Sequence, residues 1–100
     1  MFKEYSIFQF NLNNDSLIER YSYDSISTTK ELKDYIIKFF YLEFEQNLKE
    51  KDLNQIGFKT LIEINKTISN NNLIDFINLK HIVSIIYIVQ YNTMFFLVKN

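Results

Sequence analysis

The sequence has no cysteine and no proline, and it has one glycine and one histidine among its 100 residues. Without cysteine the chain can form neither a disulfide nor a thiolate metal site. One glycine cannot build a glycine-rich phosphate loop. A lone His81 excludes a multi-histidine metal site, and no nucleophile-elbow motif accompanies it for a serine–histidine–acid triad. We therefore expect a protein that is not an enzyme and holds no metal or cofactor, with His81 at a strand edge or corner.

A charge excess of either sign is also missing. Eleven Lys and Arg residues against twelve Asp and Glu residues give a formal net charge of −1. Because neutralised phosphates supply most of the affinity of duplex binders, this balance argues against nucleic acid, and single-strand base stacking is a weaker alternative. The most apolar stretch, 82–98, is shorter than the ~20 residues of a spanning helix, so a membrane anchor is not expected. It is also interrupted by Ser84, Gln90, Asn92 and Thr93.

The start of the chain and its overall composition bear on location. Glu4 and Ser6 stand where a signal peptide has its apolar core. Ile, Asn, Lys, Phe and Tyr are abundant whereas Ala, Gly, Pro and Arg are scarce, which is typical of AT-rich codons. We expect a cytoplasmic protein of a low-GC bacterium or of one of its phages.

The first quarter of the sequence predicts a β-hairpin. Alternation over 2–12 sets Phe8 on one face of a strand and Ile7 on the other. Residues 13–16, with two Asn, one Asp and one Ser, tolerate turn conformations. Alternation then returns over 17–23, which we predict to be the second strand.

A helix should follow the hairpin. Thr28 and Glu31 form a capping box, because the Thr hydroxyl can accept from the first turn while the Glu three residues on reaches back. We predict a helix over 29–50. Its apolar stripe recurs at three- and four-residue spacing and comprises Leu32, Ile36, Phe39, Phe40, Phe44 and Leu48.

Residues 52–70 fit two structures. As a helix they gather polar side chains on one face, and as a strand they alternate through Phe58, Thr60, Ile62 and Ile64. Gly57 stands where a helix would end in a left-handed residue, and β-branched residues follow it, which favours the strand. We predict a helical extension to about Gln55, a strand after Gly57, a turn at 70–72 and a strand at 73–77. A second helix over 52–70 is the alternative.

The C-terminal quarter predicts two strands, 82–89 and 94–98, joined by a turn at 91–93. Together these elements predict a single α+β domain over 1–100. The N-terminal hairpin and the C-terminal strands form an antiparallel sheet packed against one long helix, in the order ββαββββ. The order ββααββ is the alternative.

Both C-terminal strands are apolar on their two faces, and such runs mean that both faces are covered. One helix covers one face. The other must be covered by the hairpin, by 52–70 as a second helix, or by another polypeptide, since a bare patch of several hundred Å² is unusual on a soluble monomer.

Coverage by another polypeptide gives a functional hypothesis. The chain would be a small inhibitor that docks on another protein, such as a nuclease or toxin, in the manner of a bacterial immunity protein or a phage anti-defence, anti-CRISPR-type protein. Aromatic side chains dominate interface energetics, so the candidate partner-binding residues are Tyr21, Tyr23, Tyr87 and Phe95. The alternative is a self-assembling structural homo-oligomer, such as a homodimer, that uses the same face.

Overall fold

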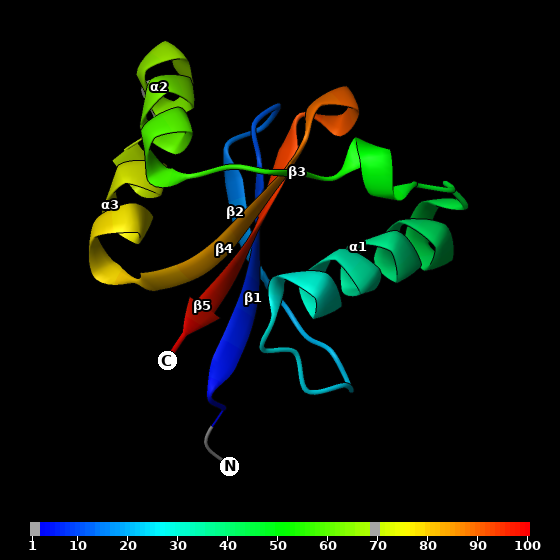
Figure 1. Ribbon diagram of the computed structural model, residues 1–100. Coiled ribbons are helices and arrows are strands. Elements are labelled where there is room, and N and C mark those ends of the chain that lie inside the picture. The colour runs from blue at the N-terminus through cyan, green and yellow to red at the C-terminus, as the bar shows by residue number, and fades with distance from the viewer. Residues whose placement is uncertain (1–2, 69–70) are drawn as a thin grey trace.

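The computed structural model describes residues 3–68 and 71–100, which form one five-stranded antiparallel sheet and three α-helices (Figure 1). The strand order is β2-β1-β5-β4-β3. The α+β class predicted from the sequence is confirmed, with three helices in place of one. The elements in chain order are β1 Tyr5–Asn11, β2 Ser16–Arg20, α1 Thr29–Phe44, η1 Glu50–Asp52, β3 Asn54–Gln55, α2 Phe58–Ile68, α3 Asn71–Leu79, β4 His81–Ile88, η2 Val89–Tyr91 and β5 Thr93–Lys99.

The predicted N-terminal hairpin is confirmed as β1 and β2. Their register pairs Phe10 with Leu17 across the hairpin. The turn uses the predicted polar residues, and Asp15 takes a left-handed conformation with φ 56°, which Asp tolerates. The second strand ends at Arg20, three residues before the predicted end at Tyr23, so 21–28 form a loop that leads into α1.

Helix α1 begins where the capping box predicts and ends earlier than predicted. The Thr28 hydroxyl accepts a hydrogen bond from the Glu31 amide, and the Glu31 carboxylate accepts one from the Thr28 amide. The helix stops at Phe44 because Glu45 is left-handed, with φ 55°, and its amide bonds back to Tyr41. The predicted end at residue 50 is therefore wrong, although Leu48 still returns to the core.

The strand predicted after Gly57 is wrong, because Phe58–Ile68 is helix α2. The Gly57 carbonyl accepts the Leu61 amide at 3.1 Å, so the glycine begins this helix instead of ending the previous one. Leu61 and Asn65, one turn apart, are its buried side chains among those described. The alternative prediction of a second helix over 52–70 gave the right type of element, although α2 begins only at Phe58. The predicted helical extension to Gln55 is also wrong, since Asn54–Gln55 forms β3.

The strand predicted at 73–77 is helix α3, and its buried residues Leu73 and Phe76 lie at helical spacing. Of the turn predicted at 70–72, Asn70 lies outside the described residues, and Asn71 and Asn72 open α3. Helix α3 therefore leads into β4, and His81 is the exposed first residue of β4, at a corner of the kind expected for it.

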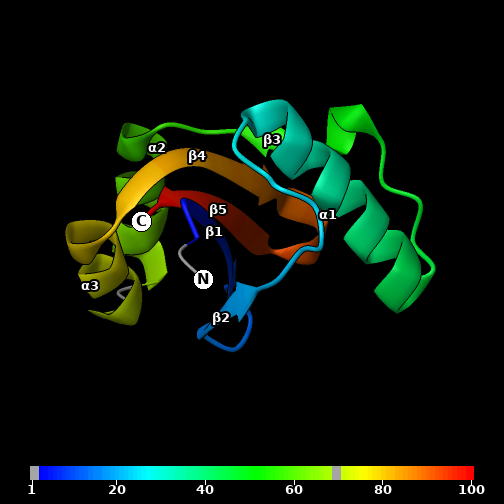
Figure 2. The same cartoon turned by 90° about the horizontal axis from the view of Figure 1, so that it is seen from below.

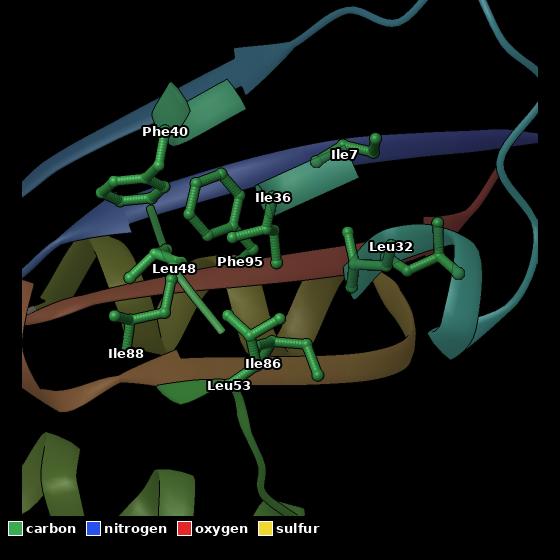
Figure 3. Packing of buried hydrophobic residues seen from close by; sticks show 10 residues of the cluster. Ile7, Leu32, Ile36, Phe40, Leu48, Leu53, Ile86, Ile88 and Phe95 are labelled. Carbon is green, nitrogen blue, oxygen red and sulfur yellow. The ribbon is translucent and has the colours of Figure 1, made fainter. Parts of the chain in front are cut away.

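The two predicted C-terminal strands are confirmed as β4 and β5, and their side chains alternate between two cores. Phe95 and Leu97 of β5 enter the α1-side core, which Figure 3 shows in close view. Phe96 and Val98 enter the core beneath α2 and α3. The register shifts between Ile82 and Ser84, so the intervening Val83 is left exposed while both neighbours stay buried.

Both faces of the sheet are covered, as the apolar runs predicted, and the chain itself supplies both covers. Figure 2 shows α1 on one side of the sheet and α2 with α3 on the other. Phe76 of α3 packs its ring against Phe8 of β1 and Phe96 of β5, with both centroid distances 5.0 Å. The expectation that a partner covers a bare face of β4 and β5 is therefore wrong.

Candidate functional site

The four candidate partner-binding residues fall into two environments. Phe95 has no exposed surface and packs against Tyr35, Phe39 and Phe40 of α1. Tyr87 is partly buried on the α2–α3 side, and its hydroxyl lies 3.3 Å from the Asn92 side-chain oxygen. All four were chosen because they were expected on an uncovered sheet face. In the covered sheet, Phe95 is a core residue and Tyr87 is largely one.

Tyr21 and Tyr23 lie instead in the connection between β2 and α1, where we define residues 21–26 as the tyrosine loop. Tyr21 is 71% exposed and Tyr23 is fully exposed. Figure 1 shows this segment as a cyan loop that extends away from the sheet before it leads into α1. The structure therefore brings these two of the four predicted side chains together on one surface.

Both ends of the tyrosine loop are anchored. At its start, Arg20 donates from Nε to the Gln9 side-chain oxygen at 2.9 Å, and its guanidinium lies over the Phe39 ring. At its end, the Glu31 carboxylate accepts the amides of Ser27 and Thr28, each at 3.1 Å. These hydrogen bonds hold the pKa of Glu31 below its ordinary value, the Ser27 amide being the largest cause, so this carboxylate stays ionised.

The middle of the loop makes fewer contacts. The Ser22 hydroxyl accepts the Asp24 amide at 3.1 Å, and the Lys3 ammonium lies 4.2 Å from the centre of the Tyr21 ring. Ile26 packs against the α1-side core. A hollow of about 510 Å³ separates the loop from β1 on one side. The loop is thus held at both ends, and its two tyrosines are presented to solvent.

A groove of about 510 Å³ lies on the other side of the loop, between it and α1. Its α1 wall carries an apolar row, Tyr35, Phe39 and Leu42, spaced so that the three side chains share one side of the helix. Its loop wall carries Tyr21 and Tyr23. We call this hollow the loop–helix groove.

The α1 wall is the part of the site that the sequence analysis missed. Phe39 was assigned to the buried stripe, and it is only partly buried. Leu42 was not considered, and it is 66% exposed. The spacing of Tyr35, Phe39 and Leu42 was a visible signal for a second apolar row beside the buried one. The spacing alone did not show that the tyrosine loop would face this row.

Carboxylates dominate the charge along the groove. Lys38 is the single cationic side chain among the described residues that line it, whereas four acidic residues do so: Asp24, Glu31, Asp34 and Glu43. Burial raises the pKa of the Tyr35 hydroxyl above its ordinary value of 10.0; the Arg20 guanidinium opposes that rise and the Glu43 carboxylate adds to it. The Tyr35 hydroxyl therefore stays protonated at neutral pH.

Other kinds of site were also considered within residues 3–68 and 71–100. No three His, Cys, Asp or Glu side chains of these residues are grouped so that they could hold a metal ion. None of the helices that the structure describes has the length and apolarity to cross a bilayer. The chain matches no protein-family model, no curated protein and no solved structure.

Proposed function

We propose that this chain is a non-enzymatic protein-binding module that docks its partner on the tyrosine loop and in the loop–helix groove. One observation carries the proposal: two tyrosines, Tyr21 and Tyr23, stand exposed over an apolar groove wall. Exposed aromatic side chains in a loop that is held at both ends are the usual anchors of protein interfaces.

The composition of the loop supports this role. Its residues 21–25 are Tyr, Ser, Tyr, Asp and Ser. Tyrosine offers a large amphipathic ring with few rotatable bonds, and small hydroxyl side chains adapt their hydrogen bonds to a partner, which is why both are enriched in antibody binding loops.

The free energies expected on binding support a role for the groove as well as for the loop in holding a partner. Two tyrosines bury about 300 Å² or more between them, worth on the order of 8 kcal/mol gross. Association costs about 4–15 kcal/mol, so the tyrosines alone give little or no net affinity. A partner that also fills the groove gains the apolar surface of Phe39 and Leu42. A specific complex therefore needs both walls.

We further propose that the module is a small inhibitor in a bacterial cytoplasm, of the immunity or phage anti-defence kind, with a nuclease or toxin as its partner. The exposed tyrosines of the loop, which suit docking on the surface of another protein, support this class. The homodimer alternative loses its original basis, because the sheet face that it required is covered by α2 and α3.

Affinity capture from a lysate of the source organism tests the proposal. Three baits are compared: the native chain, the double variant Tyr21→Ala/Tyr23→Ala, and the control Leu79→Ala. Leu79 is 80% exposed at the end of α3, on the opposite side of the sheet. We expect a protein that the native chain and the control retain and the double variant loses. If every retained protein binds all three baits equally, the tyrosine loop is not the binding surface.

A further inference from the structure

We infer that the partner segment that enters the loop–helix groove is basic and amphipathic, with Lys or Arg side chains flanking an apolar centre. This inference rests on the proposed function and adds the chemistry of the partner. Its basis is the juxtaposition of an apolar helix row with carboxylates on both flanks and on the facing loop.

The flanks of the row follow from helix geometry. Successive residues of an α-helix are rotated by about 100°, so Asp34 and Glu43 fall on opposite sides of the row that runs from Tyr35 to Leu42. Both line the groove, and Asp24 lines it from the loop. An apolar segment laid along the row therefore has carboxylates on either side of it and on the facing loop, with Lys38 as the one cation among the described residues that line the groove.

The chain neutralises these carboxylates only in part. Asp34 pairs with Lys30 at 3.2 Å, in an exposed ion pair of the kind that contributes little. The Glu31 carboxylate is occupied by the helix cap. Asp24 and Glu43 belong to neither of the two ion pairs found in the described part of the chain. Charge complementarity therefore favours a cationic partner and disfavours an acidic one.

The aromatic walls point to the same chemistry. The Tyr21 ring carries the Lys3 ammonium on one face at 4.2 Å, and the Phe39 ring carries the Arg20 guanidinium at 4.8 Å. Aromatic faces attract cations through the ring quadrupole, and the long stems of Lys and Arg pack on apolar surface. Two rings that line the groove thus already contact cations of the chain's own, and a partner's Lys or Arg can use the fully exposed Tyr23 ring in the same way.

The test uses random 12-residue peptides displayed on phage. Peptides are selected on the native protein after those that bind the variant Tyr21→Ala/Tyr23→Ala have been removed. We expect the selected peptides to combine Lys or Arg with aliphatic or aromatic residues. Their synthetic forms are then measured by fluorescence polarisation against the native chain and against the double variant Asp24→Asn/Glu43→Gln.

The double variant should bind the peptides about three- to tenfold more weakly, the scale of two partly exposed charge pairs. A matched control, Glu63→Gln/Asp75→Asn, removes the same charge from exposed positions on α2 and α3 and should bind like the native chain. Raising the salt from about 50 to 500 mM should weaken native binding more than binding by the groove variant.

The outcomes separate the two proposals. Loop-dependent peptides without a basic excess, or equal binding by the native chain and the Asp24→Asn/Glu43→Gln variant, would overturn the inference and leave the proposed function standing. Selection that yields no peptide dependent on Tyr21 and Tyr23 would contradict both.

Discussion

Strand β5 and the tyrosine loop are both rich in aromatic side chains, and they place them in opposite environments. In β5, Phe95 and Phe96 point to the two faces of the sheet, and neither has exposed surface. In the loop, Tyr21 and Tyr23 are largely or fully exposed. The neighbours make the difference: apolar residues flank the rings of β5, whereas Ser22 separates the two rings of the loop and Asp24 follows them.

This contrast shows where an interaction surface can lie in a chain that is rich in apolar residues. The continuous apolar run of β5 marks a strand that two helical layers enclose. In the tyrosine loop, by contrast, the two aromatic residues alternate with small polar residues and are largely or fully exposed. The most hydrophobic part of this chain is therefore its core, and its candidate binding surface has intermediate polarity.

The largest effect that distinguishes the two regions is expected from Phe95→Ala. This ring contacts three aromatic rings of α1 and has no exposed surface, so its removal leaves a cavity in the α1-side core. We expect the free energy of unfolding to fall by about 3–5 kcal/mol, measured by urea denaturation. A loss below about 1 kcal/mol would show that Phe95 is not enclosed as described.

A smaller loss is expected from Thr28→Ala, which removes the N-cap of α1 and one anchor of the tyrosine loop. The free energy of unfolding should fall by about 1 kcal/mol. Amide hydrogen exchange in the first turn of α1 should accelerate at Glu31. The substitution Thr60→Ala, at an exposed position of α2, is the control and should leave that exchange unchanged.

Acid should weaken the same anchor. The pKa of Glu31 lies lower in the folded chain than its ordinary 4.5, so its contribution to stability is fully present above 4.5 and is lost as the pH falls through the folded value. We therefore measure the urea midpoint of unfolding between pH 7 and pH 3. Below pH 4.5 it should fall less steeply with pH in the variant Glu31→Gln than in the native chain. Identical slopes would contradict the assigned role of this carboxylate.

The smallest effect on stability is expected from Tyr23→Ala, because the ring is fully exposed. The free energy of unfolding should change by no more than about 0.5 kcal/mol. Affinity for a captured partner should nevertheless fall about tenfold or more, as for a central aromatic anchor. Titration calorimetry measures the affinity. If the Tyr23→Ala variant unfolds more easily but binds the partner equally well, Tyr23 stabilises the fold, as Phe95 does, and is not a binding residue.

Local signals predicted the parts of the fold that local interactions determine. The alternation of β1, the capping box at Thr28 and the apolar runs of β4 and β5 all gave the observed elements. The region after Gly57 could not be assigned in this way, because Phe58, Ile62 and their neighbours fit a period of two as well as a helix. The need to cover the second sheet face decided that region, and this is a tertiary constraint.

The same limit applied to the candidate site. Sequence reasoning placed Tyr21, Tyr23 and Phe95 on one sheet face, because residue type alone does not show which rings are enclosed. Tyr21 and Tyr23 are exposed, but in a loop beyond the end of β2. Sequence reasoning could not find the groove, because that depends on how the tyrosine loop stands over Phe39 and Leu42.

Site-specific photo-crosslinking in the source cell tests the central claim most directly. Benzoylphenylalanine is placed at Ser25, which is exposed on the loop wall of the groove, and separately at Gln90, which is exposed in η2 at the opposite end of the sheet. Irradiation should link a partner protein to the chain from position 25 and not from position 90. A partner linked from position 90 and never from position 25 would contradict the assignment of the tyrosine loop as the docking surface.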